Sequence, residues 1–423
     1  MFKNFLCLTL RLLAKATLRR YRPMIIGVTG SVGKTSTKEA IYAVLKNKFS
    51  VRRNIKNYNN EIGVPLTILG QEAGGKNLWR WLKVFLIGFF GLLYTKKYPK
   101  ILVLEMGADK IGDIAYLTDF VKCDIGVVTA VGEIPVHVEF FQGPAQVARE
   151  KSNLVRCLSK TGWAILNYDD EQVRAMAART TGQVFTYGFS DKADLRAFNL
   201  EQHLEEMANA GLVFKVDYQG NTMPIKLRGI FGQYQAYAVL AAAAVGLVFK
   251  INLVEIAQAL KEYRAPAGRL RLLRGIKNSW ILDDTYNSSP SSALGALGVL
   301  EQMPGRKIAA LGDMLELGAF TEEAHRKIGV KAAGVLEYLL AVGERSIFLA
   351  DEAKKNGLPE DRIRHFASAE EAGCFLQEII QEGDVILVKG SQGLRMEKIV
   401  KEIMAEPDKA KELLVRQDEA WFR

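Results

Sequence analysis

GVTGSVGKTST at residues 27–37 is a glycine-rich turn that ends in Lys34 and Thr35 and follows the apolar run MIIGV at residues 24–28. The backbone amides of such a turn, with the N-terminus of the next helix, surround a phosphate group, and the lysine supplies a counter-charge. The common form of this motif has a glycine six residues before the lysine. Val28 stands there instead, so the match is T-G-x-x-G-K-T. The turn predicts that a nucleotide phosphate binds between a strand and a helix.

Apolar runs alternate with helical stretches over the first half of the chain. The runs are ILVLEMGA at 101–108, DIGVVTAV at 124–131 and GWAILNYDD at 162–170. Continuous apolar strands separated by helices are typical of a parallel sheet covered on both faces, whose ligands bind beyond the carboxyl ends of the strands. Residues 183–231 have shorter, alternating segments, which predict an antiparallel addition.

The segment RAPAGRL at residues 264–270 marks a domain boundary, because Pro266 and Gly268 separate a helical stretch from a new strand. After it the alternation resumes with WILDDTY, KIAALGD and DVILVKGS. The sequence therefore predicts an α/β protein. A central P-loop domain with a mostly parallel sheet spans residues 24–264, and a smaller Rossmann-like α/β domain spans residues 265–423.

The net charge of +10 is local rather than spread over the 423 residues. Residues 1–23 hold six basic residues and no acid, and residues 74–100 hold another six and no acid. The rest of the chain is close to neutral, so the charge does not indicate a nucleic-acid partner. The four cysteines are scattered without metal-ligand spacing, as in reduced cytoplasmic proteins. We expect a cytoplasmic protein.

Both basic segments are also rich in large apolar residues. They read FKNFLCLTLRLLAKATLRRYR at 2–22 and NLWRWLKVFLIGFFGLLYTKKYPK at 77–100. Basic residues interleaved with Leu, Phe and Trp suit helices that lie in a membrane interface. The uncharged run at 84–94 has 11 residues, against the roughly 20 that span a bilayer. We expect peripheral contact with the inner face of the membrane; the alternative is that these helices pack only on the protein.

Several polar residues follow the predicted strands. Residues 54–69, NIKNYNNEIGVPLTIL, place four asparagines and a glutamate before an apolar run, which is unusual for a core. Glu105 ends one predicted strand, and His137 lies beyond the next. Carboxylates beside a phosphate loop suit Mg²⁺, although an isolated carboxylate or histidine is more often an ordinary surface group.

The motifs together resemble the Mur ligase family. They are TGSVGKTS, NYNNEIGVPLTIL, LEMGADKIGDIAYL, GRLRLL, DDTYNSSP, LGDMLELG with EEAHRKIG, and LVKGSQGLRMEKIV. The resemblance runs from about residue 24 to the C-terminus and is nearest to the branch that adds D-alanyl-D-alanine. It implies an ATP-dependent amide ligase of peptidoglycan precursor synthesis. Such a ligase phosphorylates a muramoyl-peptide carboxylate, and the dipeptide amine then attacks the acyl phosphate to release ADP and phosphate.

The resemblance also implies roles for individual residues. ATP binding falls to Gly30, Ser31, Val32, Gly33, Lys34, Thr35, Ser36, Gln235, Arg269, Asp284, Tyr286 and Asn287. The residues implied to hold two Mg²⁺ ions are Thr35, Glu105, His137 and Lys151. Those implied in catalysis are Lys34, Asn60, His137 and Lys151, and those implied to bind the amine substrate are Lys389 and Ser391. Lys151 matches a family lysine that becomes carbamylated, which turns a cation into a metal-bridging anion.

Two departures from the family change what we expect. The family has G-x-H-N-x-x-N where this chain has GQYQAYA at 232–238. Gln235 can replace an amide that binds adenine, whereas Ala238 cannot. Typical members also have an N-terminal domain that grips a UDP-sugar, whereas here the basic apolar segment 1–23 precedes the first strand. We therefore expect a partner that replaces this domain, or a lipid-linked acceptor.

Two other functions stay open at this point. One is a sister amide ligase with another acceptor, similar to the folylpolyglutamate synthases. The other is a non-catalytic ATP-binding module at a membrane surface. The presence of Lys34, Glu105, His137 and Lys151 favours an enzyme, because a binding module does not need residues for a second metal.

Overall fold

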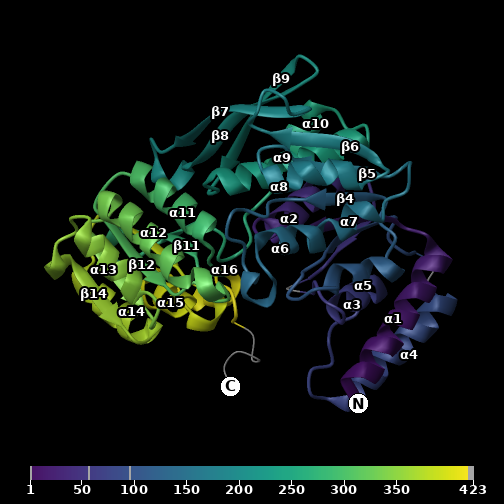
Figure 1. Cartoon of the computed structure of the whole chain (residues 1–423), viewed down its shortest axis with the longest axis horizontal. Helices are drawn as coiled ribbons and strands as arrows, with labels where there is room; N and C mark the ends of the chain where they lie inside the picture. Colours follow the sequence, from purple (N-terminus) through teal and green to yellow (C-terminus); the bar gives the residue numbers. More distant parts are fainter. Residues whose placement is uncertain (1, 56–57, 95–96, 418–423) are drawn as a thin grey trace.

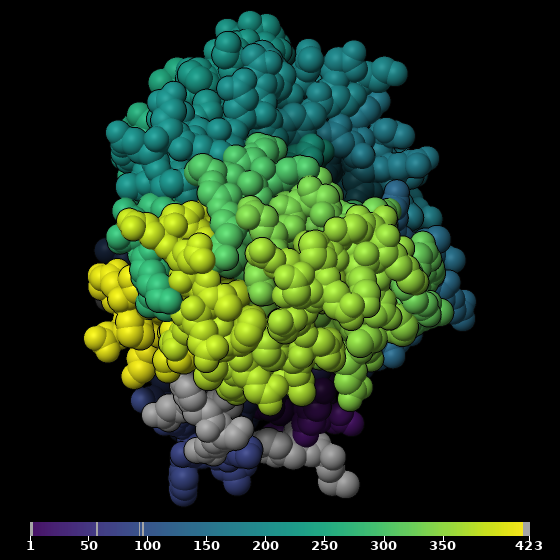
Figure 2. All heavy atoms as spheres, turned by 90° about the vertical axis from the view of Figure 1, so that its left-hand side faces the viewer, coloured from purple at the N-terminus to yellow at the C-terminus, as the bar shows by residue number. Residues whose placement is uncertain are grey.

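The computed structural model describes residues 2–55, 58–94 and 97–417, which form two α/β units, each built on its own sheet (Figure 1). A nine-stranded sheet belongs to the first unit and a six-stranded sheet to the second. In Figure 2 the green and yellow residues of the second unit fill the centre of the face, and the teal residues of the first unit lie above them. The predicted α/β class is confirmed.

The nine-stranded sheet is mostly parallel and runs in the order β2-β3-β1-β4-β5-β6-β7-β8-β9. Its strands are β1 (Met24–Thr29), β2 (Val51–Arg53), β3 (Ile101–Glu105), β4 (Ile125–Val128), β5 (Trp163–Asn167), β6 (Gln183–Gly188), β7 (Leu195–His203), β8 (Gly211–Tyr218) and β9 (Asn221–Arg228). Only β8 pairs antiparallel with its neighbours β7 and β9; β6 is parallel to β5 and β7. The expected antiparallel addition is thus narrower than residues 183–231. The first residues of β6 are exposed, which gives a parallel strand a half-polar sequence.

Helices cover both faces of this sheet, because alternate residues of a strand point to opposite sides. One face of β1 contributes Ile26 and Val28 to a core with α2 (Lys34–Leu45), α9 (Gln233–Val248) and α10 (Leu253–Leu260). The other face contributes Ile25 to a core with α3 (Gly63–Leu69), α5 (Asp113–Phe120), α6 (Pro144–Lys151), α7 (Asn153–Arg156) and α8 (Glu171–Arg174). The continuous apolar strands of the sequence are therefore buried on both sides.

The six-stranded sheet repeats this arrangement in the order β10-β11-β15-β12-β13-β14, with only β10 antiparallel. Its strands are β10 (Arg271–Arg274), β11 (Trp280–Asp284), β12 (Lys307–Gly312), β13 (Tyr338–Val342), β14 (Ile363–Phe366) and β15 (Val385–Lys389). One face carries α11 (Pro290–Gln302), α12 (Thr321–Val335) and α13 (Ile347–Lys355), and the other carries α14 (Ala369–Ile379), α15 (Glu397–Ile403) and α16 (Ala410–Leu413). The linker between α10 and β10 contains Pro266 and Gly268. The boundary between residues 264 and 265 stays a proposal.

Two further helices lie side by side at one edge of the first unit (Figure 1). They are α1 (Phe2–Tyr21) and α4 (Leu78–Tyr94), which come from the two basic segments. Leu6 and Leu10 of α1 join Trp81 and Val84 of α4 in a small core of their own. None of the helices in the described part of the chain is both long and apolar enough to cross a bilayer.

Candidate functional site

A cavity of about 840 Å³ lies between the two units, at the carboxyl ends of β1, β3, β11 and β15. The first unit contributes Ser31, Val32, Gly33, Lys34, Ser36, Asn59, Asn60, Glu105, Asp109, His137 and Gln235 to its lining. The second unit, with its linker, contributes Arg269, Asp284, Tyr286, Asn287, Glu316, Lys389, Ser391 and Arg395. Every predicted site residue except Gly30, Thr35 and Lys151 lines this cavity. Residues from both halves of the sequence therefore share one site.

The turn after β1 requires glycine at residue 30 and folds the Lys34 side chain back over the backbone. Gly30 has a φ of 148°, and a side chain there would meet the Thr129 hydroxyl. Lys34 begins α2, and its Nζ donates to the Gly30 carbonyl at 2.8 Å, which folds the amine back over the turn. Burial lowers the pKa of Lys34, and the nearby Glu105 carboxylate acts in the opposite direction. A phosphate group would supply the negative charge that this buried amine favours.

Glu105 ends β3 as a buried carboxylate, only 3% exposed. Its Oε1 accepts a hydrogen bond from Asn59 Nδ2 at 3.1 Å, and its backbone N–H donates to Asn54 Oδ1 at 2.6 Å. Its Oε2 lies 3.7 Å from Lys38 Nζ but accepts no hydrogen bond from the described residues. A buried carboxylate oxygen is costly without a partner, so this atom is suited to a cation or a donor on a ligand.

His137 connects the two units at the edge of the cavity. It has a left-handed backbone conformation with a φ of 68°, just before the short 3₁₀ helix Val138–Phe140. Its Nδ1 lies 2.5 Å from Glu316 Oε2 of the second unit, and its Nε2 lies 3.6 Å from Asp109 Oδ1. The contact with His137 lowers the pKa of Glu316 against the effect of its partial burial. The imidazole thus pairs with carboxylates on both sides of the interface.

Lys151 is the last residue of α6 and is almost fully buried. Burial, and next the Lys34 charge, lower the pKa of its amine to about 7, while Asp109 and Glu150 act to raise it. Its side chain therefore lies close enough to the phosphate loop for the two amines to repel each other. At neutral pH a large fraction of this amine is uncharged.

Arg269 extends from the second unit to the P-loop. Its Nη2 donates to the Thr35 hydroxyl at 3.4 Å, and its guanidinium stacks 3.8 Å from the centre of the Tyr286 ring. Its Nε is buried and makes no hydrogen bond within the described part of the chain, and the same is true of the Ser31 hydroxyl. Unsatisfied donors from both units therefore face the position where the turn predicts a phosphate.

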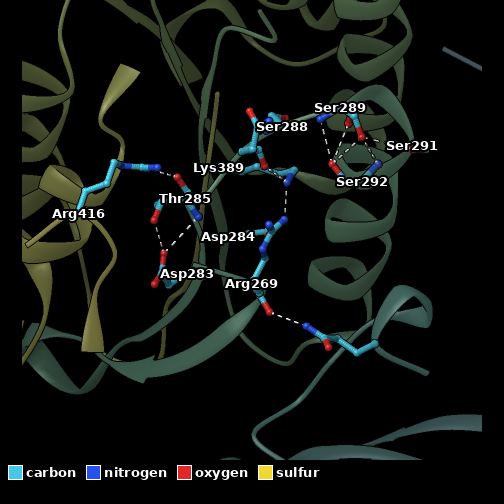
Figure 3. Close-up of polar contacts among 12 residues, drawn as sticks. Arg269, Asp283, Asp284, Thr285, Ser288, Ser289, Ser291, Ser292, Lys389 and Arg416 are labelled. Carbon is cyan, nitrogen blue, oxygen red and sulfur yellow. Dashed lines mark hydrogen bonds and ion pairs between the residues drawn. The ribbon is translucent and has the colours of Figure 1, made fainter. Parts of the chain in front are cut away.

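Asp284 and Lys389 form a buried ion pair across the ends of β11 and β15 (Figure 3). Lys389 Nζ donates to Asp284 Oδ2 at 2.5 Å and to the Asn287 carbonyl at 3.0 Å. Burial lowers the pKa of Lys389, and Asp284 raises it. The pair fixes the wall of the cavity that faces the P-loop.

The wall of the cavity formed by Asp284 and Lys389 is stabilised by residues that do not line the cavity themselves. Asp283 is buried, and it accepts from the Thr285 hydroxyl at 2.6 Å and from the Gly268 N–H at 3.1 Å. Burial raises its pKa to about 6. Arg416 donates to the Thr285 carbonyl (Figure 3) and also to the Tyr286 carbonyl. The neighbouring aspartates thus differ, because Asp283 braces the loop while Asp284 faces the site.

Three predicted ligand residues also make contacts within the protein. The Gln235 amide donates to the Arg269 carbonyl at 3.0 Å and accepts from the Tyr263 hydroxyl at 2.9 Å, so it ties α9 to the linker. The Ser391 hydroxyl accepts from the Leu315 N–H at 2.8 Å. Asn60 Oδ1 accepts from two amides at the start of α3. Their contacts with adenine, amine substrate and reacting groups stay predictions.

Several residues of the cavity were not assigned a role from the sequence, among them Asn59, Asp109, Glu316 and Arg395. Asn59 and Asp109 lie in motifs that carried the resemblance, next to residues that were assigned. Glu316 lies in LGDMLELG, another such motif, but nothing in the sequence pairs it with His137 across about 180 residues. Only the fold brings these carboxylates together.

The residues of the cavity suit an Mg²⁺ ion whose ligands are mainly phosphate oxygens and water. Across residues 2–55, 58–94 and 97–417, no three His, Cys, Asp or Glu side chains gather as a complete metal site. Mg²⁺ usually takes one or two protein carboxylates and completes its shell with water and substrate phosphates. The unsatisfied Glu105 oxygen and the Thr35 hydroxyl beside the turn match that requirement.

Comparisons with known proteins agree over most of the chain. A family model for the Mur ligase middle domain matches residues 28–79 and 87–246, and one for the Mur ligase glutamate ligase domain matches residues 268–392. UDP-N-acetylmuramoyl-tripeptide--D-alanyl-D-alanine ligases from Bacillus subtilis (strain 168) and Escherichia coli (strain K12) are each 30% identical to this chain. These matches cover 94% and 89% of this chain, and 79% and 76% of those proteins. The crystal structure of MurF ligase from Thermotoga maritima in complex with ADP has a TM-score of 0.77 at 25% identity, over 95% of this chain and 84% of that one.

Proposed function

The chain belongs to the Mur ligase family of ATP-dependent ligases, and we propose that it joins D-alanyl-D-alanine, or a similar dipeptide, to the carboxylate of a muramoyl-peptide precursor of peptidoglycan. The observation that carries this proposal is the shared cavity. One unit contributes a phosphate-binding turn, and the other contributes Arg269, Asp284 and Lys389 opposite it. A site divided in this way suits a reaction that brings three substrates together and must exclude water from an activated acyl group.

The chemistry explains why ATP is consumed. A carboxylate is a poor electrophile because its negative charge repels nucleophiles. In the proposed reaction a carboxylate oxygen attacks the γ-phosphorus of ATP, ADP leaves, and an acyl phosphate forms. The dipeptide amine then attacks the acyl carbon, the amine loses a proton, and the C–O bond to phosphate breaks to give the amide. The protein mainly neutralises charge and positions the reactants.

Phosphate recognition is assigned to cations from both units. Lys34 and the P-loop amides would hold the phosphates from one side, and Arg269, which already contacts Thr35, would hold them from the other. Asp284 would accept hydrogen bonds from the ribose hydroxyls beside Tyr286 and Asn287. Arg269 already joins the second unit to Thr35 of the first unit. Bound ATP would add a further, charged link between the units.

Magnesium is assigned to the Thr35 hydroxyl and the Glu105 carboxylate. When bound, Mg²⁺ supplies positive charge to phosphate oxygens during phosphoryl transfer. A second ion is assigned to His137 and to a carbamate on Lys151. The carbamate forms when the neutral amine attacks carbon dioxide and loses a proton, so an amine with a pKa of about 7 favours it. His137 also pairs with Glu316 and Asp109, which places two more carboxylates beside it.

The two other substrates are assigned to the rest of the cavity. Lys389 and Ser391 would face the incoming dipeptide, and Asn60 would lie near the reacting groups. We place the reaction in the cytoplasm, where ATP is available. What contacts the sugar end of the acceptor stays a prediction.

Phosphate release from ATP tests the proposed function directly. We expect release to require both a muramoyl-peptide carboxylate and D-alanyl-D-alanine, and to be lost in Lys34→Ala, with the amide product identified by mass spectrometry. Omitting either substrate in turn provides the matched control. If no muramoyl-peptide supports release with the dipeptide, or if a folate or another acceptor does so instead, the proposed reaction is wrong.

A further inference from the structure

Large apolar side chains on α1 and α4 are exposed to solvent. We call them the outer face: Phe5, Leu8 and Leu12 of α1, and Trp79, Leu82, Leu86, Phe89, Phe90 and Tyr94 of α4. Trp79 is 79% exposed and Leu8 56%. Soluble monomers seldom gather so many large apolar groups on neighbouring helices unless a partner or a membrane covers them. The outer face lies outside the cavity described above.

The two helices are nevertheless firmly placed by their inner sides. Leu13 of α1 lies against Gly88 of α4, where an added methyl group would be in van der Waals contact with it. The Tyr21 hydroxyl donates to the Gly91 carbonyl at 2.7 Å, and the Tyr21 ring stacks on Tyr98 at 4.6 Å. The helices thus run side by side in the same direction, and their inner residues pack on α3. The exposed side chains belong to an anchored pair of helices.

Basic residues accompany the outer face. With 3.6 residues per turn, Lys15 and Arg19 continue the same side of α1 as Leu8 and Leu12. Arg80 and Lys83 stand among the apolar residues of α4.

The basic residues beside the outer face differ from Lys3 and Arg11 of α1 in whether they have an acidic partner. Lys3 and Arg11 pair with Glu61 and Asp119, which lie outside the two basic segments. For Lys15, Arg19, Arg80 and Lys83, by contrast, no acidic partner is found among the residues that the structure describes. The outer face therefore combines exposed apolar groups with uncompensated positive charge.

The partner that suits both the apolar groups and the positive charge of the outer face is an anionic membrane surface. Apolar side chains enter the boundary between headgroups and acyl chains, lysine and arginine attract anionic headgroups, and Trp and Tyr favour the same depth. A second copy of the chain would bring two positive faces together, which like-charge repulsion disfavours. Neither helix is long and apolar enough to cross a bilayer, so both would lie in its plane.

We propose that the outer face of α1 and α4 docks this protein on the surface of an anionic lipid bilayer. The docking is independent of the ligase reaction, because it uses residues outside the cavity and needs no substrate. It places the site at the cytoplasmic surface of a membrane, where an acceptor attached to lipid would be within reach.

Vesicle co-sedimentation of the full chain is the first test. Vesicles of phosphatidylglycerol and phosphatidylcholine should bind the protein at least tenfold more tightly than vesicles of phosphatidylcholine alone, and added salt should weaken the binding. The double variant Trp79→Glu, Phe90→Glu should lose at least tenfold of that binding. Val254→Glu is the matched control, because Val254 is a 63% exposed apolar residue of α10, away from the outer face.

A second variant guards against loss of folding. Lys15→Gln with Arg19→Gln changes only polar ends of exposed or half-exposed side chains, and it should lower binding to anionic vesicles while ATP affinity is unchanged. Wild-type protein that ignores anionic vesicles, or variants that bind as well as wild type, would overturn the proposal. So would a dimer in solution that Trp79→Glu, Phe90→Glu converts to monomer without any vesicle binding, because a second copy would then cover the face.

Discussion

Lys151 is a residue whose chemistry is set by its surroundings. Burial and the Lys34 charge lower its pKa to about 7, so the fraction of neutral amine grows as the pH rises through about 7. Only the neutral amine reacts with carbon dioxide. We expect Lys151→Ala to keep its ATP affinity and to lose ligation by about 100-fold or more, as when a group that stabilises transition-state charge is removed. Turnover and nucleotide calorimetry measure the two effects.

The pH dependence separates a carbamate from an ordinary lysine. Wild-type protein stripped of carbon dioxide should regain activity on adding bicarbonate, and more completely above about pH 7 than below it. Lys122→Ala is the control, because Lys122 is an exposed lysine just beyond the end of α5. Unchanged turnover in Lys151→Ala, or no response to bicarbonate at any pH, would rule out the carbamate.

The Asp284–Lys389 pair contributes to stability and binding in ways that mutation can separate. Removing one partner of a buried pair leaves the other uncompensated, which costs about 3 to 5 kcal/mol. We expect Asp284→Asn to lower the free energy of unfolding by an amount near that range, and Asp284→Asn with Lys389→Met to recover most of it. ATP affinity should fall in both variants, because the proposed contact with the ribose would be lost. Urea unfolding and calorimetry on the same samples test this, and full recovery of ATP affinity by the double variant would contradict the ribose role.

The local sequence predicted the role of a residue where that role depends only on the neighbouring residues in the chain. The turn at 27–37 indicates its function by glycine spacing and a following helix, and the structure places Lys34 as expected at the start of α2. Lys151 looks like a surface lysine in AREKSNL, and its burial arises only when the chain folds. Glu316 could not be paired with His137 for the same reason, since the contact exists only after both units fold.

At the scale of elements, buried strands were easier to predict than partly exposed ones. β1, β3 and β4 read as continuous apolar runs because helices cover both of their faces. β6 begins with exposed residues, so its sequence resembles that of an antiparallel strand although it pairs in parallel with β5. The side-chain pattern reports exposure, and strand direction depends on the connection between the strands.

His325, in the first half of α12, contacts the loop that carries Glu316. The buried His325 accepts from the Met314 N–H at 3.0 Å through Nε2, and its Nδ1 lies 2.7 Å from the Thr321 carbonyl. Nε2 must be unprotonated to accept this bond, and burial lowers the pKa of His325. Protonation of His325 would therefore break the contact that orders residues 313–317.

This gives a stability prediction with a defined sign. The folded-state pKa of His325 lies below its unfolded value of about 6.5, so the unfolded chain takes up the proton first as the pH falls. Its contribution to stability is complete above about pH 6.5 and declines below it by up to about 1.4 kcal/mol per pH unit. His325→Gln should remove that slope. Urea unfolding from about pH 5 to 7.5 measures it, and parallel curves for the two proteins would exclude the role of His325.

At the scale of the whole molecule, the two units are joined by a shared apolar cluster, to which the first unit contributes Val138 and Phe231, and by a few polar contacts. Arg269 contacts Thr35, His137 pairs with Glu316, and Lys327 pairs with Glu133 at 3.3 Å. Two of these contacts involve residues of the cavity, so separating the units would also separate residues that line the site. ATP would strengthen closure, because its phosphates would lie between the P-loop and Arg269.

Glu316→Ala should therefore favour an open arrangement that nucleotide reverses. Without nucleotide, small-angle scattering should give a larger radius of gyration for the variant than for wild type, because the His137 pair is lost. With a non-hydrolysable ATP analogue the two should converge, whereas Arg269→Ala should stay open. Lys331→Ala is the control, since Lys331 pairs with Glu301 at 2.6 Å within the second unit and does not join the units. Equal radii for Glu316→Ala and wild type without nucleotide would show that this contact does not govern closure, and the interface would then depend on Arg269.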